Sequence, residues 1–152
     1  RSGRTLPYVV ITVALLGALA LGRGRVGSVE IIPDGFDPER FPVAAVERAR
    51  AEDVPGRIFH EFVWGGYLLW AWPEQKVFID GGSDFYGGEL LRAHREVIGI
   101  QPGWRDSLEV WRIDLVLVRS DGAMAGELAR ESAWRAWYSD STATLFRRAP
   151  AP

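Results

Sequence analysis

The chain has 152 residues, with 18 Lys and Arg against 20 Asp and Glu, and its formal net charge is −2. A charge so close to neutral excludes the broad basic surface of nucleic-acid-binding domains, so we expect no nucleic-acid partner. The absence of cysteine excludes disulfides, thiolate metal sites and thiol nucleophiles.

An uncharged apolar stretch occupies residues 6–22. At ~1.5 Å per residue it reaches almost across the ~30 Å hydrocarbon core of a bilayer, and its neighbours extend it. We therefore predict a transmembrane helix over residues 5–24, which places the chain in the cell membrane with the lipid bilayer as a partner. A signal peptide and a buried helix are the alternatives.

Two features of the N-terminal region leave its setting open. Arg1 and Arg4 before the apolar stretch balance Arg23 and Arg25 after it, so charge does not decide the orientation of a membrane helix. The sequence begins with Arg rather than Met, and we expect it to be a piece of a longer protein.

Residues 25–36 combine Gly, Pro and Asp with a short apolar run and predict a juxtamembrane linker. Residues 37–149 then have the composition of a soluble α/β domain. Asp37 and Pro38 suit the N-cap and the first position of a helix that runs to about residue 53. A strand over 57–62, a helix over 64–72 and a second strand over 76–80 follow.

The second half of this domain continues the alternation of helices and strands. The sequence predicts helices over 84–98 and 103–111, a fully buried strand over 114–118, a helix over 123–131, and a closing hairpin of 134–139 with 142–147. Helices between strands imply a mostly parallel sheet flanked by helices. The fold class that we expect is therefore α/β, with a C-terminal antiparallel hairpin and one preceding transmembrane helix.

Aromatic and acidic residues follow the first two predicted strands, where open α/β sheets bind their ligands. Rings stack on sugars or peptides, and carboxylates accept hydrogen bonds from them. We therefore predict ligand-binding roles for His60, Glu61, Trp64, Tyr67, Asp80, Asp84 and Tyr86.

A structural role is the alternative for most of these side chains. The aromatic residues Trp64, Tyr67, Trp70 and Trp72 can be core residues. Asp80 and Asp84 can be turn and helix caps, which Asp favours, and His60 can be packed within its strand.

Sequence signatures of catalysis are missing. The chain has no GxSxG elbow, no phosphate loop and no HExxH motif, and it has only two histidines. Glu61, Asp80 and Asp84 match the spacing of no named metal loop. We therefore predict no catalytic residue, no metal and no cofactor in this chain.

The segment RIFHEFVWGGYLLWAWPEQKVFIDGGSDFYG, followed later by RIDLVLV, resembles a C-terminal domain of polytopic bacterial membrane proteins of the GT-C glycosyltransferase type. The same order of elements distantly resembles the soluble domain of the oligosaccharyltransferase catalytic subunit. There a Trp-Trp-Asp-Tyr-Gly motif helps to hold the acceptor peptide. Trp64 and Tyr67 fall on aromatic positions of that motif, and Gly65 stands where the motif has an acid.

This resemblance implies an extracytoplasmic accessory domain that follows the last of many membrane spans. It would cover the catalytic cavity or bind the acceptor or the lipid-linked sugar, while the catalytic acid lies far upstream, outside this chain. The implied partners are the rest of the polytopic chain and a polyprenyl-phosphate-linked sugar with its acceptor. Two alternatives stay open: a non-enzymatic, single-pass anchored module that binds a protein or glycan, and a hydrolase that uses Asp80 and Asp84.

Overall fold

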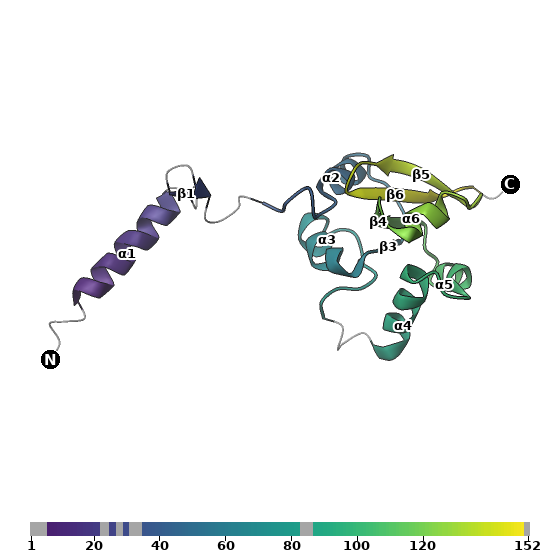
Figure 1. Cartoon of the computed structure of the whole chain (residues 1–152), viewed down its shortest axis with the longest axis horizontal. Coiled ribbons are helices and arrows are strands. Elements are labelled where there is room, and N and C mark those ends of the chain that lie inside the picture. The colour runs from purple at the N-terminus through teal and green to yellow at the C-terminus, as the bar shows by residue number, and fades with distance from the viewer. Residues whose placement is uncertain (1–5, 22–24, 27–28, 31–34, 83–86, 151–152) are drawn as a thin grey trace. The chain divides into compact units, whose positions relative to one another are not determined.

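The computed structural model describes residues 6–21, 25–26, 29–30, 35–82 and 87–150, and the chain divides into two units (Figure 1). The first unit is Arg1–Phe36 and the second is Asp37–Pro152. In the first unit, helix α1 (Leu6–Leu21) precedes two short strands, β1 (Arg25–Val26) and β2 (Val29–Glu30). These strands pair antiparallel within the predicted linker.

Helix α1 occupies the centre of the predicted transmembrane segment. It has 16 residues, and the side chains of residues 8–18 are exposed. Among the residues that the structure describes, no helix is both long enough and apolar enough to cross a membrane. Residue 5 and residues 22–24, which complete the predicted span, lie outside the described residues.

The second unit is an α/β domain whose helices and strands are distributed along its whole length. In chain order they are α2 (Val43–Ala51), β3 (Ile58–His60), the 3-10 helix η2 (Phe62–Trp64), α3 (Gly65–Ala71), α4 (Gly87–Ile98), α5 (Trp104–Val110), β4 (Leu115–Arg119), α6 (Ala123–Leu128), β5 (Trp134–Ser139) and β6 (Ala143–Arg148). The predicted α/β class is confirmed.

In the described residues of this domain, four strands form a mixed sheet in the order β3-β4-β6-β5. Strands β3 and β4 are parallel, whereas β4 with β6 and β5 with β6 are antiparallel. The predicted closing hairpin is confirmed, with a register shift between Ala136 and Tyr138 in β5. The prediction of a mostly parallel sheet is wrong, because only one of the three strand pairs is parallel.

Helices cover both faces of the sheet, as Figure 1 shows. Leu115 and Leu117 of β4 face a core shared with α2 and α3, while Val116 and Val118 face a core shared with α4, α5 and α6. Successive side chains of a strand point to opposite faces, so a strand between two helical layers must be apolar at every position. The predicted burial of this strand on both faces is confirmed.

The first helix of the domain begins later than the sequence predicts. The Asp37 carboxylate accepts the backbone N–H of Glu39, and its carbonyl accepts those of Arg40 and Phe41, so Asp37 caps an isolated turn. The residue before a proline is disfavoured in the α conformation, and Pro42 therefore separates this turn from α2. Helix α2 then starts at Val43.

The predicted strand over residues 76–80 is wrong, since this segment forms no strand beside β3. Two histidine side chains make the hydrogen bonds at that edge of β3. The backbone N–H of Phe78 donates to His60 Nε2 at 3.1 Å, and His94 Nε2 bonds the His60 carbonyl at 3.0 Å. The Phe78 N–H and the His60 carbonyl are thus both bonded to imidazole rings, and no ladder of backbone hydrogen bonds joins residues 76–80 to β3.

Two neighbouring glycines in α3 provide a test of this packing. A Cβ atom on Gly65 would lie 2.2 Å from the Ile79 carbonyl oxygen and 2.8 Å from Asp80 Cα, whereas Gly66 has nothing within 4 Å. We expect Gly65→Ala to lower the free energy of unfolding by about 1–3 kcal/mol, because backbone atoms must move. Gly66→Ala, the matched control, should raise it by about 0.5–1 kcal/mol. Urea denaturation measures both, and equal effects would contradict the close approach.

Candidate functional site

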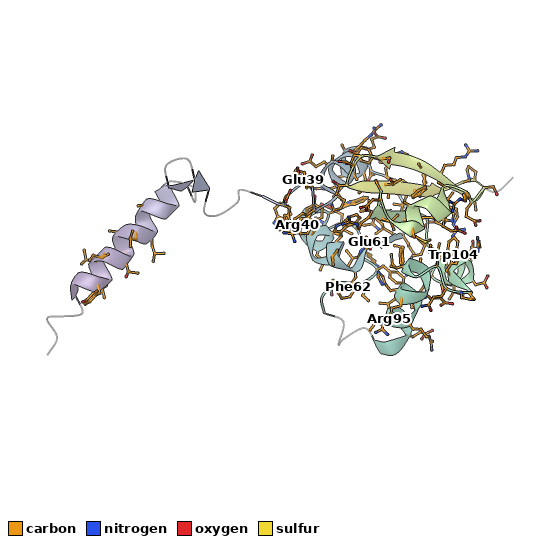
Figure 2. The ribbon with its side chains drawn as sticks, in the orientation of Figure 1. Glu39, Arg40, Glu61, Phe62, Arg95 and Trp104 are labelled. Carbon is orange, nitrogen blue, oxygen red and sulfur yellow. The ribbon has the colours of Figure 1, made fainter. Side chains whose placement is uncertain are left out.

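The parallel strands β3 and β4 end at the same edge of the sheet, and a small cavity opens there. Its volume is about 230 Å³, and its lining residues come from the turn before α2, from η2 and from the end of β4. They are Glu39, Arg40, Phe41, Val63, Trp64 and Arg119. We call this space the carboxyl-end cavity; Figure 2 labels Glu39 and Arg40 in the turn and Glu61 at the end of β3.

The charges around this cavity are partly bonded to neighbouring protein groups. The Arg119 guanidinium donates from Nε and from one terminal nitrogen to the two carboxylate oxygens of Asp121, at 3.0 and 2.9 Å. The half-buried Glu61 accepts the Arg119 backbone N–H at 3.3 Å, and burial raises the pKa of the Glu61 carboxyl. Glu39 and Arg40 are exposed, so the wall of the cavity carries both an anion and a cation.

Two of the predicted aromatic ligand residues are placed in the core. Trp64 is 1% exposed, and its indole N–H donates to the Arg40 carbonyl at 3.0 Å. Tyr67 is 3% exposed, its ring centroid lies 5.6 Å from that of Phe41, and loss of hydration raises its pKa to about 12. Trp64 therefore fixes the turn before α2, and only Trp64 of the two lines the cavity.

His60 lies completely buried at the end of β3. Because its Nε2 accepts the Phe78 N–H, its proton is on Nδ1, which donates to the Glu61 carbonyl at 2.8 Å. Burial lowers the pKa of His60 to about 4, and repulsion from His94, when His94 is protonated, acts in the same direction. Both ring nitrogens are thus occupied by the backbone, and the structure gives His60 the packed role rather than a position facing a ligand.

His94 supports the same corner from α4. Its ring stacks on Phe59 with centroids 5.1 Å apart and an interplanar angle of 25°. Burial also lowers the pKa of His94. The hydrogen bond from Nε2 to the His60 carbonyl fixes α4 to β3, and neither histidine of the chain is available as an exposed acid or base.

The acidic loop after residue 79 is described only in part. The Asp80 carboxylate accepts the backbone N–H of Gly82 at 2.8 Å, which is the turn-capping role typical of aspartate. The predicted ligand residues Asp84 and Tyr86 lie outside the described residues. Of the predicted set, the structure therefore brings Glu61 and Trp64 to the carboxyl-end cavity and its immediate edge.

Three exposed apolar side chains on η2 and α3 were not predicted to lie at the surface. Val63, Leu69 and Trp70 are 70%, 46% and 67% exposed, and Val63 also lines the cavity. We call these three residues the α3 apolar face. The helical period of α3 could have predicted the exposure of Leu69 and Trp70. Tyr67, Leu68 and Ala71 face the core, so positions 69 and 70 point away from the core.

The described side chains at this site offer hydrogen-bond donors and an acceptor to a ligand. Among the described residues, no group of three or more His, Cys, Asp or Glu side chains is arranged to hold a metal ion. The half-buried Glu61 and the buried His60 bond to the backbone, and the exposed pair of Glu39 and Arg40 offers a hydrogen-bond acceptor and several donors. Hydroxyl-bearing ligands such as sugars match such a pair.

Comparisons with known proteins found no match: no protein-family model, no curated protein and no solved structure is significantly similar to this chain.

The pKa of His60 makes the stability of the domain depend on pH. The folded pKa of about 4 lies below the ordinary value of 6.5, so the unfolded chain binds the proton more readily. The stabilisation is fully present above pH 6.5 and is lost as the pH falls to about 4. At roughly 1.4 kcal/mol per pKa unit, we expect the free energy of unfolding to fall by about 3 kcal/mol over this window, apart from other groups.

An NMR titration of the two imidazoles provides the direct measurement. We expect His60 to stay neutral, with its proton on Nδ1, down to about pH 4. Protonation of His60 near pH 6.5 in the folded protein would contradict the buried, accepting role of Nε2.

Proposed function

We propose that residues 37–149 form an extracytoplasmic accessory domain of a polytopic, glycosyltransferase-like membrane protein. The domain covers the catalytic cavity of the membrane part and contacts the acceptor or the polyprenyl-phosphate-linked sugar. Turnover resides in the upstream part of the longer protein, and the domain alone has none.

One observation carries this proposal: a polar cavity and an exposed apolar face share a residue. Val63 belongs to the carboxyl-end cavity and to the α3 apolar face. A surface of this kind matches two neighbours at once, with Glu39 and Arg40 facing a sugar and Leu69 and Trp70 facing apolar membrane segments. The resemblance of residues 55–148 to C-terminal domains of GT-C-type proteins points to the same pair of neighbours.

In this proposal, α1 lies in the bilayer as the last membrane segment before the domain. Its 16 residues correspond to about 24 Å, which is shorter than the ~30 Å hydrocarbon core. The uncharged composition of α1 and the exposure of its central side chains support a lipid environment. The cell membrane is thus the proposed location, with the domain on its outer side.

The α3 apolar face is tested in the full-length parent protein, assayed in membranes for transfer from a polyprenyl-phosphate-linked sugar. We expect Trp70→Ala to reduce transfer about tenfold, equivalent to about 1.4 kcal/mol, because the docking surface loses its largest side chain. The matched control is Val110→Ala on α5, which removes another exposed apolar side chain, and it should leave transfer unchanged. Both variants should keep the thermal midpoint of the parent.

Two results would overturn this proposal. Equal transfer by the Trp70→Ala and Val110→Ala variants would remove the docking role of the α3 apolar face. An upstream coding sequence without further membrane spans would exclude the transferase and favour the anchored interaction module, whose ligand the same face would then bind.

A further inference from the structure

A second and larger groove lies at the other end of the sheet, where the chain enters β3 and leaves β6. Its volume is about 830 Å³, and the loop before β3 forms one wall with Pro55 and Gly56. Arg135, Trp137 and Arg147 from the β5–β6 hairpin contribute the opposite wall. None of these residues lines the carboxyl-end cavity.

Two arginines of this groove are direct cross-strand partners. Arg135 of β5 pairs with Arg147 of β6 in the antiparallel register, and both side chains are exposed. Like charges directly opposite each other in a sheet repel and destabilise it. Such a pair is therefore an arrangement that the fold alone does not favour.

The anionic groups nearby bond to other residues. Within the described part of the chain, Arg135 and Arg147 have no ion pair, whereas Arg148 pairs with Glu109 and donates to the Ile113 carbonyl at 2.9 Å. The Asp114 carboxylate lines the groove and accepts the Arg57 backbone N–H at 2.9 Å. No described carboxylate therefore forms an ion pair with Arg135 or Arg147, although the Asp114 carboxylate lines the same groove.

We propose that this groove binds a phosphate group between the guanidinium groups of Arg135 and Arg147. A guanidinium presents its N–H donors in a planar fork that matches phosphate oxygens, and an anion between two of them removes their repulsion. The half-buried Trp137 also lines the groove and adds an aromatic side chain to it. The ligand is a free phosphate or diphosphate, or the phosphate of a lipid headgroup.

This inference goes beyond the proposed function and does not depend on it, because it uses other residues at another end of the sheet. The two are tested separately: failure of phosphate binding leaves the transfer assay unaffected, and failure of transfer by the Trp70→Ala parent leaves phosphate binding unaffected.

The experiment is calorimetric titration of the full 152-residue chain, in a neutral detergent, with inorganic pyrophosphate. We expect Arg135→Gln with Arg147→Gln to weaken binding at least about tenfold, because two charge-assisted contacts are lost. The matched control is Arg95→Gln, which removes an exposed arginine from α4 and should leave the affinity unchanged (Figure 2). No binding of either pyrophosphate or an anionic short-chain phospholipid to the wild-type chain, or equal losses in the control, would overturn the proposal.

A second measurement keeps the test independent of folding defects. Because Arg135→Gln removes one of two opposed charges, it should raise the thermal midpoint of the ligand-free chain while it weakens pyrophosphate binding. A lower midpoint together with unchanged binding would show that the arginines serve the sheet alone, and would overturn the proposal.

Titration with water-soluble dihexanoyl phosphatidylglycerol, against dihexanoyl phosphatidylcholine, distinguishes the two sources of phosphate. Stronger binding of the anionic lipid than of pyrophosphate identifies a lipid headgroup. Stronger binding of pyrophosphate identifies a free phosphate ligand. Either result supports the proposed site if the Arg135→Gln, Arg147→Gln double variant no longer binds that ligand.

Discussion

The hydrogen bonds of the neutral imidazole of His60 are the interactions on which the arrangement of this domain depends. Its Nε2 accepts the Phe78 N–H, its Nδ1 donates to the Glu61 carbonyl, and its own carbonyl is bonded by His94. One buried residue thereby joins the 76–80 segment, the turn into η2 and helix α4 to the end of β3. A buried imidazole fills this role only while it is neutral, because a second ring proton would face the Phe78 N–H with a donor. The position of η2, which lines the carboxyl-end cavity with Val63 and Trp64, follows from it.

Sequence reasoning predicted the elements whose pattern is local. The apolar run within residues 114–118 predicted the buried strand, and the segments 134–139 and 142–147 predicted the hairpin. In the hairpin turn the Asp140 carboxylate accepts the N–H groups of Thr142 and Ala143. The strand predicted over residues 76–80 was wrong. The side-chain pattern of this segment matches a strand, but its Phe78 N–H bonds to the ring of His60 and not to a neighbouring strand. The local sequence pattern does not show that the side chain of a distant residue will take the place of a backbone carbonyl as hydrogen-bond acceptor. Pro42 is compatible with the observed start of α2 at Val43. Asp37 and Pro38 are equally compatible with a helix start, so the local sequence alone did not distinguish the two positions.

The candidate site shows the same division between local and long-range information. The strand order placed the cavity at the carboxyl ends of the parallel pair, as expected for an open α/β sheet. The sequence did not predict which side chains line the cavity. Trp64, for example, both lines the cavity and donates a hydrogen bond to the Arg40 carbonyl. Arg40 and Arg119 come from segments far apart in the chain, and no spacing in the sequence joins them. The groove of Arg135 and Arg147 was equally hidden, because opposition across a hairpin depends on a register that a bulge shifts.

Both open edges of the sheet are protected from pairing with a second chain, by two different means. An exposed strand edge presents a regular row of N–H and C=O groups and is a template for aggregation. At the β3 edge, the His60 carbonyl is already bonded by an imidazole and the Phe78 segment lies alongside. At the β5 edge, the register shift between Ala136 and Tyr138 interrupts the row, and the charge of Arg135 lies close by. By these two means the domain can remain separate from copies of itself even at high protein concentration.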